Sequence, residues 1–285
     1  MNDTEASSML IGTQRLRARL DDAHCCIVDV RHDLFDTQAG IRAYREGHIP
    51  GAVFADIEKQ LSGKKTGQNG RHPLPRRDEL VETFRAWGIN GDTQIVAYDA
   101  HGGQFASRLW WLARWLGHTR VALLDGGWPK WLGDTQLSSR QAPKRARGSF
   151  TASESMMPLA TVQQVLHSLD SHDRTLLDAR TPERYRGEQE PIDPVAGRIP
   201  GARNRPWQQN LSPDQTFKSP RALRSEFEAL LDSRTPDQIT HQCGSGVTAC
   251  HNVFAMELAG LPGSALYGGS WSEWIADPER PVATG

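Results

Sequence analysis

The sequence predicts an α/β protein built from two similar modules. Short, β-branched apolar runs alternate with stretches whose apolar residues recur every three to four positions. This alternation is typical of buried parallel strands with helices on both faces of the sheet. The chain also repeats several motifs in the same order, roughly 150 residues apart, which indicates a duplicated unit.

The expected elements follow from these patterns in chain order. In the first module, the patterns predict strands at 26–30 and 95–98 and helices at 77–87 and 108–116. The second module repeats them as strands at 175–179 and 239–242 and helices at 220–231 and 248–258. Ligands of such sheets bind at the carboxyl ends of the strands, so the residues after 95–98 and 239–242 are the first candidates for a site.

The repeated motifs set the module boundaries. IVDVR at 27–31 recurs as LLDAR at 176–180, GHIPGA at 47–52 as GRIPGA at 197–202, and GGW at 126–128 as GGSW at 268–271. We therefore expect a first module at 9–137 and a second at 158–285, each of ordinary domain size. The segment 138–157 between them is rich in Ser, Arg, Ala and Pro without an apolar period, which favours an exposed, flexible linker over a functional basic patch.

The composition excludes several classes of function. The formal net charge of the 285 residues is −1, so no overall field attracts nucleic acid or an anionic membrane. The N-terminal residues MNDTEASSML lack the apolar core of a signal peptide, and no run approaches the roughly 18 apolar residues of a membrane span. The four cysteines, of which Cys25 and Cys26 are adjacent, do not form a disulfide scaffold, so we expect reduced thiols and a cytoplasmic location.

The two modules differ in the loop that follows their central strand. The first has Asp99, in DAHGG, and the second has Cys243, in CGSGVTA. Both segments lie between a predicted strand and a predicted helix. Because duplicated modules usually keep their cores and diverge at their sites, we expect the second module to carry the reactive group and the first to be non-catalytic.

Cys243 has the expected setting of a reactive thiol. It should lie at the exposed carboxyl edge of the sheet, where Gly244 and Gly246 allow tight or left-handed conformations that turn N–H groups toward one point. The positive end of the following helix faces the same point. These features favour a thiolate at neutral pH within an anion-binding loop.

Three other interpretations of this segment are weaker. A buried structural cysteine is common for an isolated thiol, but the two glycines and the strand–loop–helix context favour a reactive one. A cysteine phosphatase needs an arginine six residues after the cysteine to bind phosphate, and Ala249 occupies that position. The two cysteines and two histidines between 241 and 251 fit no common zinc-ligand spacing, so no metal is expected.

The motifs together resemble those of tandem rhodanese-family sulfurtransferases over nearly the whole chain. They are VDVR and LDAR, GHIPGA and GRIPGA, DGGW and YGGSW, and CGSGVTA at 243–249. The last is typical of the 3-mercaptopyruvate branch, whereas thiosulfate enzymes usually carry Arg-Lys where this chain has Gly244-Ser245. The resemblance implies a doubly wound, parallel five-stranded sheet in each module and a catalytic second module.

The resemblance also implies a covalent mechanism without cofactor or metal. Cys243 would attack the sulfane sulfur of a small anionic donor and pass it, as a persulfide, to cyanide, a thiol or a dithiol protein. Backbone N–H groups of the loop would bind the donor and stabilise the persulfide. They belong to Gly244, Gly246, Val247 and Thr248.

Two arginines are candidates for donor binding. Arg184 matches the family's donor-binding arginine, with a surface ion pair as the alternative, and Arg186 is a nearby second candidate. Mercaptopyruvate enzymes typically have another arginine after a downstream Glu-Pro pair, but here that pair is followed by Ile192. The donor therefore stays open between mercaptopyruvate and thiosulfate.

A Ser–His–acid relay proposed for the mercaptopyruvate branch would correspond to Ser245, His72 and Glu58. His72 and Glu58 fall in the first module, so we expect the relay to combine residues of both modules. A solvated loop histidine is the alternative for His72.

An enzyme is the leading hypothesis, and two other classes remain open. One is a persulfide carrier or regulatory module that is loaded only by a partner protein. The other is a redox-sensing thiol protein, which would form a disulfide or sulfenic acid with peroxide and transfer no sulfur.

Overall fold

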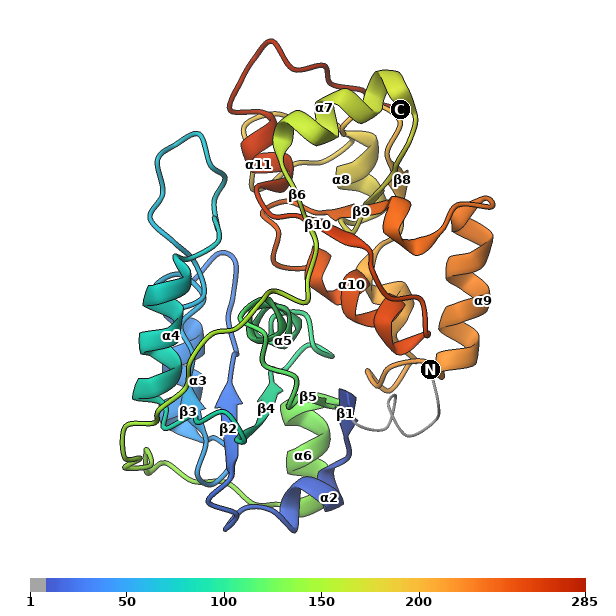
Figure 1. The fold of residues 1–285 in the computed structure, drawn as a ribbon. Helices are drawn as coiled ribbons and strands as arrows, with labels where there is room; N and C mark the ends of the chain where they lie inside the picture. Colours follow the sequence, from blue (N-terminus) through green and yellow to red (C-terminus); the bar gives the residue numbers. More distant parts are fainter. Residues whose placement is uncertain (1–8) are drawn as a thin grey trace. The chain divides into compact units, whose positions relative to one another are not determined.

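The computed structural model describes residues 9–285, which divide into two compact units (Figure 1). The first unit comprises the described residues up to Gly63 with Pro75–Met156 and Leu211–Phe217. The second comprises Lys64–Leu74, Met157–Asn210 and Lys218–Gly285. Lys64–Leu74, which carries His72, thus folds with the second unit although its sequence neighbours belong to the first. Conversely, Leu211–Phe217 folds with the first unit although its sequence neighbours belong to the second.

The first unit holds a five-stranded parallel sheet with strand order β1-β5-β4-β2-β3. Its strands are β1 (Leu10–Ile11), β2 (Cys25–Asp29), β3 (Val53–Phe54), β4 (Gln94–Tyr98) and β5 (Val121–Leu124). Its helices are α2 (Thr13–Arg17), α3 (Ala39–Glu46), α4 (Arg77–Ala86), α5 (Ala106–Trp115) and α6 (Gly127–Thr135).

The second unit repeats this topology with strand order β6-β10-β9-β7-β8, again with parallel neighbours. Its strands are β6 (Leu159–Ala160), β7 (Thr175–Asp178), β8 (Arg203–Asn204), β9 (Ile239–Gln242) and β10 (Ala265–Tyr267). Its helices are α7 (Val162–Ser171), α8 (Pro182–Arg186), α9 (Pro220–Leu231), α10 (Ala249–Leu258) and α11 (Ser270–Trp274), with 3₁₀ turns at Trp207–Asn210 and Pro236–Gln238. The predicted α/β fold with two parallel five-stranded sheets is confirmed.

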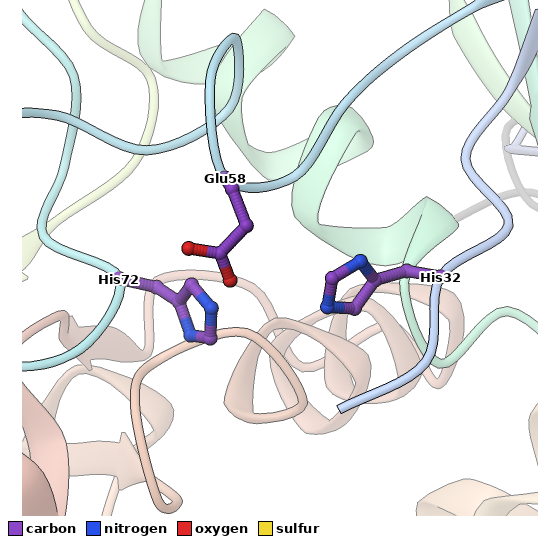
Figure 2. Close-up of side chains that lie close together, drawn as sticks. All are labelled: His32, Glu58 and His72. Atoms are coloured by element: carbon purple, nitrogen blue, oxygen red, sulfur yellow. The ribbon is translucent and has the colours of Figure 1, made fainter. Parts of the chain in front are cut away.

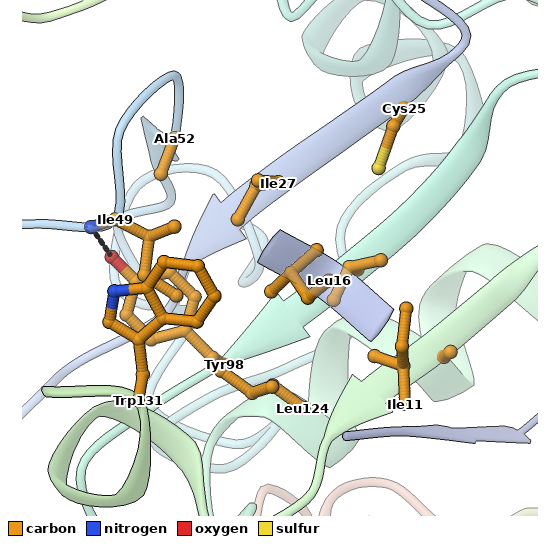
Figure 3. Close-up of a cluster of buried hydrophobic side chains, with 11 residues drawn as sticks. Ile11, Leu16, Cys25, Ile27, Ile49, Ala52, Tyr98, Leu124 and Trp131 are labelled. Carbon is orange, nitrogen blue, oxygen red and sulfur yellow. Dashed lines mark hydrogen bonds between the residues drawn. The ribbon is translucent and has the colours of Figure 1, made fainter. Parts of the chain in front are cut away.

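Alternate residues of each strand face opposite layers of helices. In the first unit, Cys25 and Ile27 of β2 pack in one cluster with Leu16 of α2 and Trp131 of α6 (Figure 3). Cys26, between them, points to the other face, where its thiol contacts the carbonyl of Trp87 at the end of α4 (3.6 Å). Both faces are therefore buried, as the near-continuous apolar strands predict.

The helices that follow the two candidate loops are core helices. In α10 every residue is buried, and in α5 the residues from Ala106 to Ala113 are buried. A helix that is buried on all sides lies in the interior of a domain. The loop before each helix is consequently fixed between a central strand and a central helix.

The repeated VDVR and LDAR motifs have the same structural role in both units. Arg31 pairs with Asp29 (2.6 Å) and lies over the ring of Trp128, 4.7 Å from its centroid. Arg180 pairs with the aspartate two residues before it (2.7 Å) and lies over Trp271 at the same 4.7 Å. In each unit the buried, bidentate pair connects the sheet to the repeated tryptophan, which lies at the start of α6 in the first unit and of α11 in the second.

The segment between the modules is not the flexible tether that its composition suggests. Ser139 pairs with His48 in an antiparallel bridge, and the N–H of Phe150 donates to the carbonyl of Ile89 (3.1 Å). Phe150 is 2% exposed. Backbone hydrogen bonds and one buried ring hold the segment along the first unit, and neither leaves a periodic pattern in the sequence.

Candidate active site

Cys243 directly follows β9, and the start of α11 holds its backbone in place. The N–H of Trp271 donates to the carbonyl of Cys243 (3.0 Å), and the N–H of Ser272 donates to the carbonyl of Gly244 (2.9 Å). The N–H of Cys243 donates to the hydroxyl of Ser270 (3.1 Å). Three hydrogen bonds therefore tie the first two residues of the loop to one short helix.

The sulfur of Cys243 accepts a hydrogen bond from inside its own loop. The N–H of Gly246 donates to Cys243 Sγ (N···S 3.1 Å), and the thiol of Cys250 donates to the carbonyl of Gly246 (3.3 Å). Gly246 has φ +78°, and a Cβ on it would lie 2.1 Å from the carbonyl oxygen of Gly268. Only glycine can therefore bring this amide to the sulfur.

One expectation about the loop is wrong. Cys243 is 2% exposed, not exposed at the sheet edge, because the start of α11 packs against it and arginine side chains lie over Gly244. Of the two glycines, Gly246 adopts the left-handed conformation and Gly244 does not. A Cβ on Gly244 would lie 3.3 Å from Nη2 of Arg184 and 3.0 Å from Nη2 of Arg71, so the absence of a side chain leaves room for both guanidinium groups.

The equivalent loop of the first unit shows what such a turn binds. The carboxylate of Asp99 accepts hydrogen bonds from four backbone N–H groups of the loop, at 2.7–3.0 Å. They belong to His101, Gly103, Phe105 and Ala106. The loop between strand and helix is thus an anion-binding turn, as the sequence of the second module predicts for Cys243.

A family model for the rhodanese-like domain matches the chain twice, at residues 13–134 and 161–277. The chain belongs to the rhodanese family of sulfurtransferases. The two modules predicted from repeated motifs are therefore two rhodanese-like domains, and the predicted family is confirmed.

Full-length relatives carry two activities in their names. A "probable 3-mercaptopyruvate sulfurtransferase" of Pseudomonas aeruginosa is 48% identical over 286 residues, which cover 98% of this chain and 99% of the relative. The thiosulfate sulfurtransferase of Bos taurus is 36% identical and covers 87% of this chain and 85% of its own. Among solved structures, SseA from Escherichia coli, described as a 3-mercaptopyruvate sulfotransferase with the rhodanese fold, matches with a TM-score of 0.81, 31% identity and coverage of 93% of this chain and 99% of its own.

Of the two predicted donor-binding arginines in this rhodanese, the structure brings one to the loop. Arg184 lies over Gly244 and pairs with Glu190 (2.7 Å). Arg186 pairs with Glu188 (2.7 Å) at the surface and is not among the nearest neighbours of Gly244.

Two members of the predicted relay are in contact. His72 Nδ1 lies 2.7 Å from the hydroxyl of Ser245, and both residues are 4% exposed. His72 is therefore not a solvated loop histidine. It also belongs to the second compact unit, through Lys64–Leu74, and not to the first as its place in the sequence suggests.

Glu58 lies in a loop of the first unit. Its backbone N–H donates to the carboxylate of Asp56 (2.9 Å), and one of its carboxylate oxygens lies within 4.8 Å of a ring nitrogen of His32 (Figure 2). That Glu58 completes the relay stays a prediction.

Sequence reasoning missed Ser270, which holds the backbone of Cys243. It is fully buried at φ +54°, the conformation that Gly127 adopts at the matching position of the first unit (φ +55°). Its hydroxyl accepts from the N–H of Cys243 and donates to the carbonyl of Tyr267 (2.9 Å). A residue other than glycine is uncommon in this conformation, and the change from GGW to GGSW was the available signal.

Proposed function

We propose that this rhodanese transfers a sulfane sulfur from 3-mercaptopyruvate to cyanide, a thiol or a dithiol protein through a persulfide on Cys243. The observation that carries the proposal is the hydrogen bond from the Gly246 N–H to Cys243 Sγ (3.1 Å), in a loop whose counterpart binds the Asp99 carboxylate with four N–H groups. A turn built to hold an anion stabilises both a thiolate and the persulfide that it becomes.

The reaction has two half-reactions. In the first, the Cys243 thiolate attacks the donor sulfur, an S–S bond forms, the donor C–S bond breaks, and its electron pair leaves on the enolate of pyruvate. The enolate takes up a proton to give pyruvate, and the persulfide keeps a negative charge. In the second, the acceptor attacks the outer sulfur, the S–S bond breaks, and the Cys243 thiolate returns; with cyanide the product is thiocyanate.

The loop offers donors for the outer sulfur of the persulfide. Gly246 already donates to Sγ, whereas the N–H groups of Ser245 and Val247 donate to no side chain or carbonyl within residues 9–285. Ser245 and Val247 occupy the positions of His101 and Gly103, whose N–H groups bind the carboxylate in the first unit. We assign these amides, with those of Gly244 and Thr248, to the bound donor and the persulfide.

The hydroxyl of Ser245 and the ring of His72 supply a route for the proton. At 2.7 Å from the hydroxyl, the imidazole can exchange a proton with it, and the hydroxyl lies two residues from the nucleophile. We assign this pair to protonation of the pyruvate enolate. Glu58 is the proposed third member of the relay.

The donor is assigned from the loop and from the relatives. CGSGVTA is typical of the mercaptopyruvate branch, and the relative at 48% identity carries that activity in its name. Arg184, beside Gly244, binds the donor carboxylate. Thiosulfate is the alternative donor, because the bovine thiosulfate sulfurtransferase is also a relative.

The other thiols favour a single reactive cysteine and a reducing compartment. None of the four cysteines forms a disulfide bond, and burial raises the pKa of Cys25 and raises the pKa of Cys26 to about 12. Such thiols stay protonated and unreactive at neutral pH. No helix among residues 9–285 has the length and apolar character needed to cross a bilayer. We propose a cytoplasmic site of action.

The test compares initial rates with 3-mercaptopyruvate and with thiosulfate, using cyanide as acceptor, in the wild type and in Cys243→Ser. We expect 3-mercaptopyruvate to be preferred and Cys243→Ser to lose at least about 1,000-fold in kcat. Intact mass after donor treatment should show one added sulfur atom, located by peptide mapping on Cys243. The matched control Cys25→Ser should load as the wild type does.

Each other result contradicts a specific part of the proposal. A clear preference for thiosulfate shows that the donor is wrong. Activity in Cys243→Ser, or added sulfur on Cys250, shows that the nucleophile is wrong. Loading that requires a partner protein would make the chain a carrier, and a peroxide-dependent disulfide without sulfur transfer would make it a sensor.

A further inference from the structure

Ser272 joins the two chain segments that meet at the catalytic loop. Its backbone N–H donates to the carbonyl of Gly244 (2.9 Å), so it is part of the support of that loop. Its hydroxyl accepts from the backbone N–H of Arg71 (3.0 Å) and donates to the carbonyl of Gly269 (3.2 Å). One residue of α11 thus binds the catalytic loop with its backbone and the segment Lys64–Leu74 with its side chain.

The backbone of this segment lies directly against the turn before α11. Gly70 has φ +83°, and a Cβ on it would lie 2.7 Å from the carbonyl oxygen of Gly269 and 3.1 Å from the hydroxyl of Ser272. Only glycine can adopt this conformation in so little space. The hydrogen bond to the N–H of Arg71 therefore forms where the segment approaches the turn most closely.

The segment Lys64–Leu74 brings His72 to the loop without regular structure of its own. No helix or strand lies within these residues. The imidazole of His72 nevertheless lies 2.7 Å from the hydroxyl of Ser245, and both residues are 4% exposed. Because proton exchange requires the two groups to stay within about 3 Å, the backbone anchor at Arg71, one residue before the imidazole, helps to keep the proton route intact.

Pro129 occupies the position of Ser272 in the first unit. The N–H groups of Trp128 and Trp271 each donate to the residue that follows the central strand of their unit, so the next residues, Pro129 and Ser272, correspond. Proline has neither an N–H group nor a hydroxyl. It can therefore form neither the bond to the loop nor the bond to an exchanged segment.

The first unit holds its own exchanged segment in another way. Leu211–Phe217 folds with this unit, and the N–H of Phe217 donates to the carboxylate of Asp125 (2.9 Å), just before the repeated glycines. A side chain beside the repeated turn thus binds an exchanged segment in each unit. The link from such a segment to the loop through one residue is a feature of the unit that carries Cys243.

We propose that Ser272 is a positioning residue that holds His72 against Ser245 for the first half-reaction; this rests on the function proposed above. With 3-mercaptopyruvate, the donor C–S bond breaks and the enolate of pyruvate takes up a proton, which His72 delivers through the Ser245 hydroxyl. With thiosulfate, the donor S–S bond breaks, its electron pair leaves on sulfite, and no carbon is protonated. Loss of the Ser272 hydroxyl should therefore slow the first donor and spare the second.

The test follows pyruvate or sulfite release in a single turnover, without acceptor, as a function of donor concentration. We expect Ser272→Ala to lower the limiting rate with 3-mercaptopyruvate about 10-fold, with the half-saturating concentration and the rate with thiosulfate changed less than about 3-fold. Ser272→Thr keeps the hydroxyl and should recover most of the loss. Ser168→Ala is the matched control, since its hydroxyl donates within α7; it should match the wild type.

A double-mutant cycle shows whether Ser272 acts through His72. His72→Gln alone should lower the limiting rate with 3-mercaptopyruvate about 100-fold. Adding Ser272→Ala to it should lower the rate by less than a further factor of about 2, because the group that Ser272 positions is already lost. A further 10-fold loss in the double variant would show that Ser272 acts independently of His72, and the proposal would be wrong.

Gly70→Ala tests the same contact from the side of the segment, should Ser272→Ala not fold. Its Cβ would push the segment from the turn, so it should show the same selective loss with 3-mercaptopyruvate. Equal losses with both donors in Gly70→Ala would contradict the proposal.

Persulfide loading of the wild type separates this role from the proposed function. If 3-mercaptopyruvate adds a sulfur to wild-type Cys243, but Ser272→Ala is unchanged or loses equally with both donors, the role of Ser272 is wrong and the proposed function stands. If His72→Gln keeps the wild-type rate, the role of Ser272 also fails, while sulfur transfer through Cys243 stands. If 3-mercaptopyruvate does not load wild-type Cys243 but thiosulfate does, the donor assignment fails and the role of Ser272 fails with it.

Discussion

The loops that follow β4 and β9 have the same support but surround different side chains. The N–H of Trp128 donates to the carbonyl of Asp99 (2.7 Å), just as the N–H of Trp271 donates to the carbonyl of Cys243 (3.0 Å). In the first unit the loop amides bind the carboxylate of Asp99 itself, whereas in the second an amide binds a sulfur. The same architecture therefore holds a carboxylate by backbone hydrogen bonds in one unit and a cysteine sulfur in the other.

This difference shows that the fold does not require a cysteine after its central strand. The Asp99 carboxylate accepts four hydrogen bonds from backbone N–H groups. A carboxylate at this position cannot form a disulfide-type bond with a donor sulfur. The Cys243 loop keeps amides available and adds groups that the first unit lacks, such as the Ser270 hydroxyl in place of Gly127. Four substitutions test how far the equivalence of the two loops extends.

Cys243→Asp, which copies the first loop into the second, should have the largest effect. Sulfur transfer should fall at least about 1,000-fold, because the nucleophile is lost. The variant should nevertheless fold, with a melting temperature equal to or above that of Cys243→Ser, because loop amides can bind the new carboxylate. If Cys243→Asp is insoluble or melts well below Cys243→Ser, the second loop does not bind anions.

Gly246→Ala should be the most damaging change that leaves the thiol intact. Its Cβ would lie 2.1 Å from the carbonyl of Gly268 at φ +78°, so the amide that donates to Sγ must move. We expect a loss of about 3 kcal/mol in the free energy of unfolding and of about 100-fold in kcat/KM. Urea denaturation and donor kinetics measure the two effects.

Gly133→Ala is the control for this substitution. Gly133 lies in α6 with nothing within 4 Å of a built Cβ. Alanine should stabilise the helix by about 0.5–1 kcal/mol and leave activity unchanged. If Gly133→Ala and Gly246→Ala change the free energy of unfolding and kcat/KM equally, the left-handed conformation of Gly246 is not what positions its amide.

Asp99→Asn should destabilise the first unit without removing activity. The amide keeps one acceptor oxygen and turns an NH₂ group toward backbone N–H donors, so we expect a cost of about 3 kcal/mol. Hydrogen exchange at residues 101–106 should accelerate, while kcat at 25 °C changes less than about 3-fold. Asp36→Asn, at an exposed ion pair with Arg42, should leave the free energy of unfolding nearly unchanged.

Ser270→Gly should have the smallest effect, because glycine is the residue of the first unit at this position. The backbone keeps its conformation, but the hydrogen bond to the Cys243 N–H is lost. We expect about a 5-fold fall in kcat/KM, equivalent to about 1 kcal/mol. Ser168→Ala, whose hydroxyl donates within α7, should leave kcat/KM unchanged. An unchanged rate in Ser270→Gly would make Ser270 a packing residue only.

The longer elements and the place of Cys243 between a strand and a helix could be predicted from sequence because their signals are local. The helix predicted at 220–231 and the strand predicted at 239–242 agree with Pro220–Leu231 and Ile239–Gln242 residue for residue. The two-residue strands β1, β3, β6 and β8 could not be predicted, because two residues carry no periodicity. They form only because a longer neighbouring strand pairs with them.

By itself, then, the sequence determined the duplication, the parallel α/β fold and the position of Cys243 between a strand and a helix. Repeated motifs and apolar periods are properties of neighbouring residues, so they can be recognised along a single chain. Only the tertiary structure decided that Cys243 is buried, that His72 contacts Ser245 across 173 positions of sequence, and that Arg71 and Arg184 meet over Gly244 through Asp193. Such contacts depend on the path of the folded chain, because the packing of the second unit selects which distant side chains surround the sulfur.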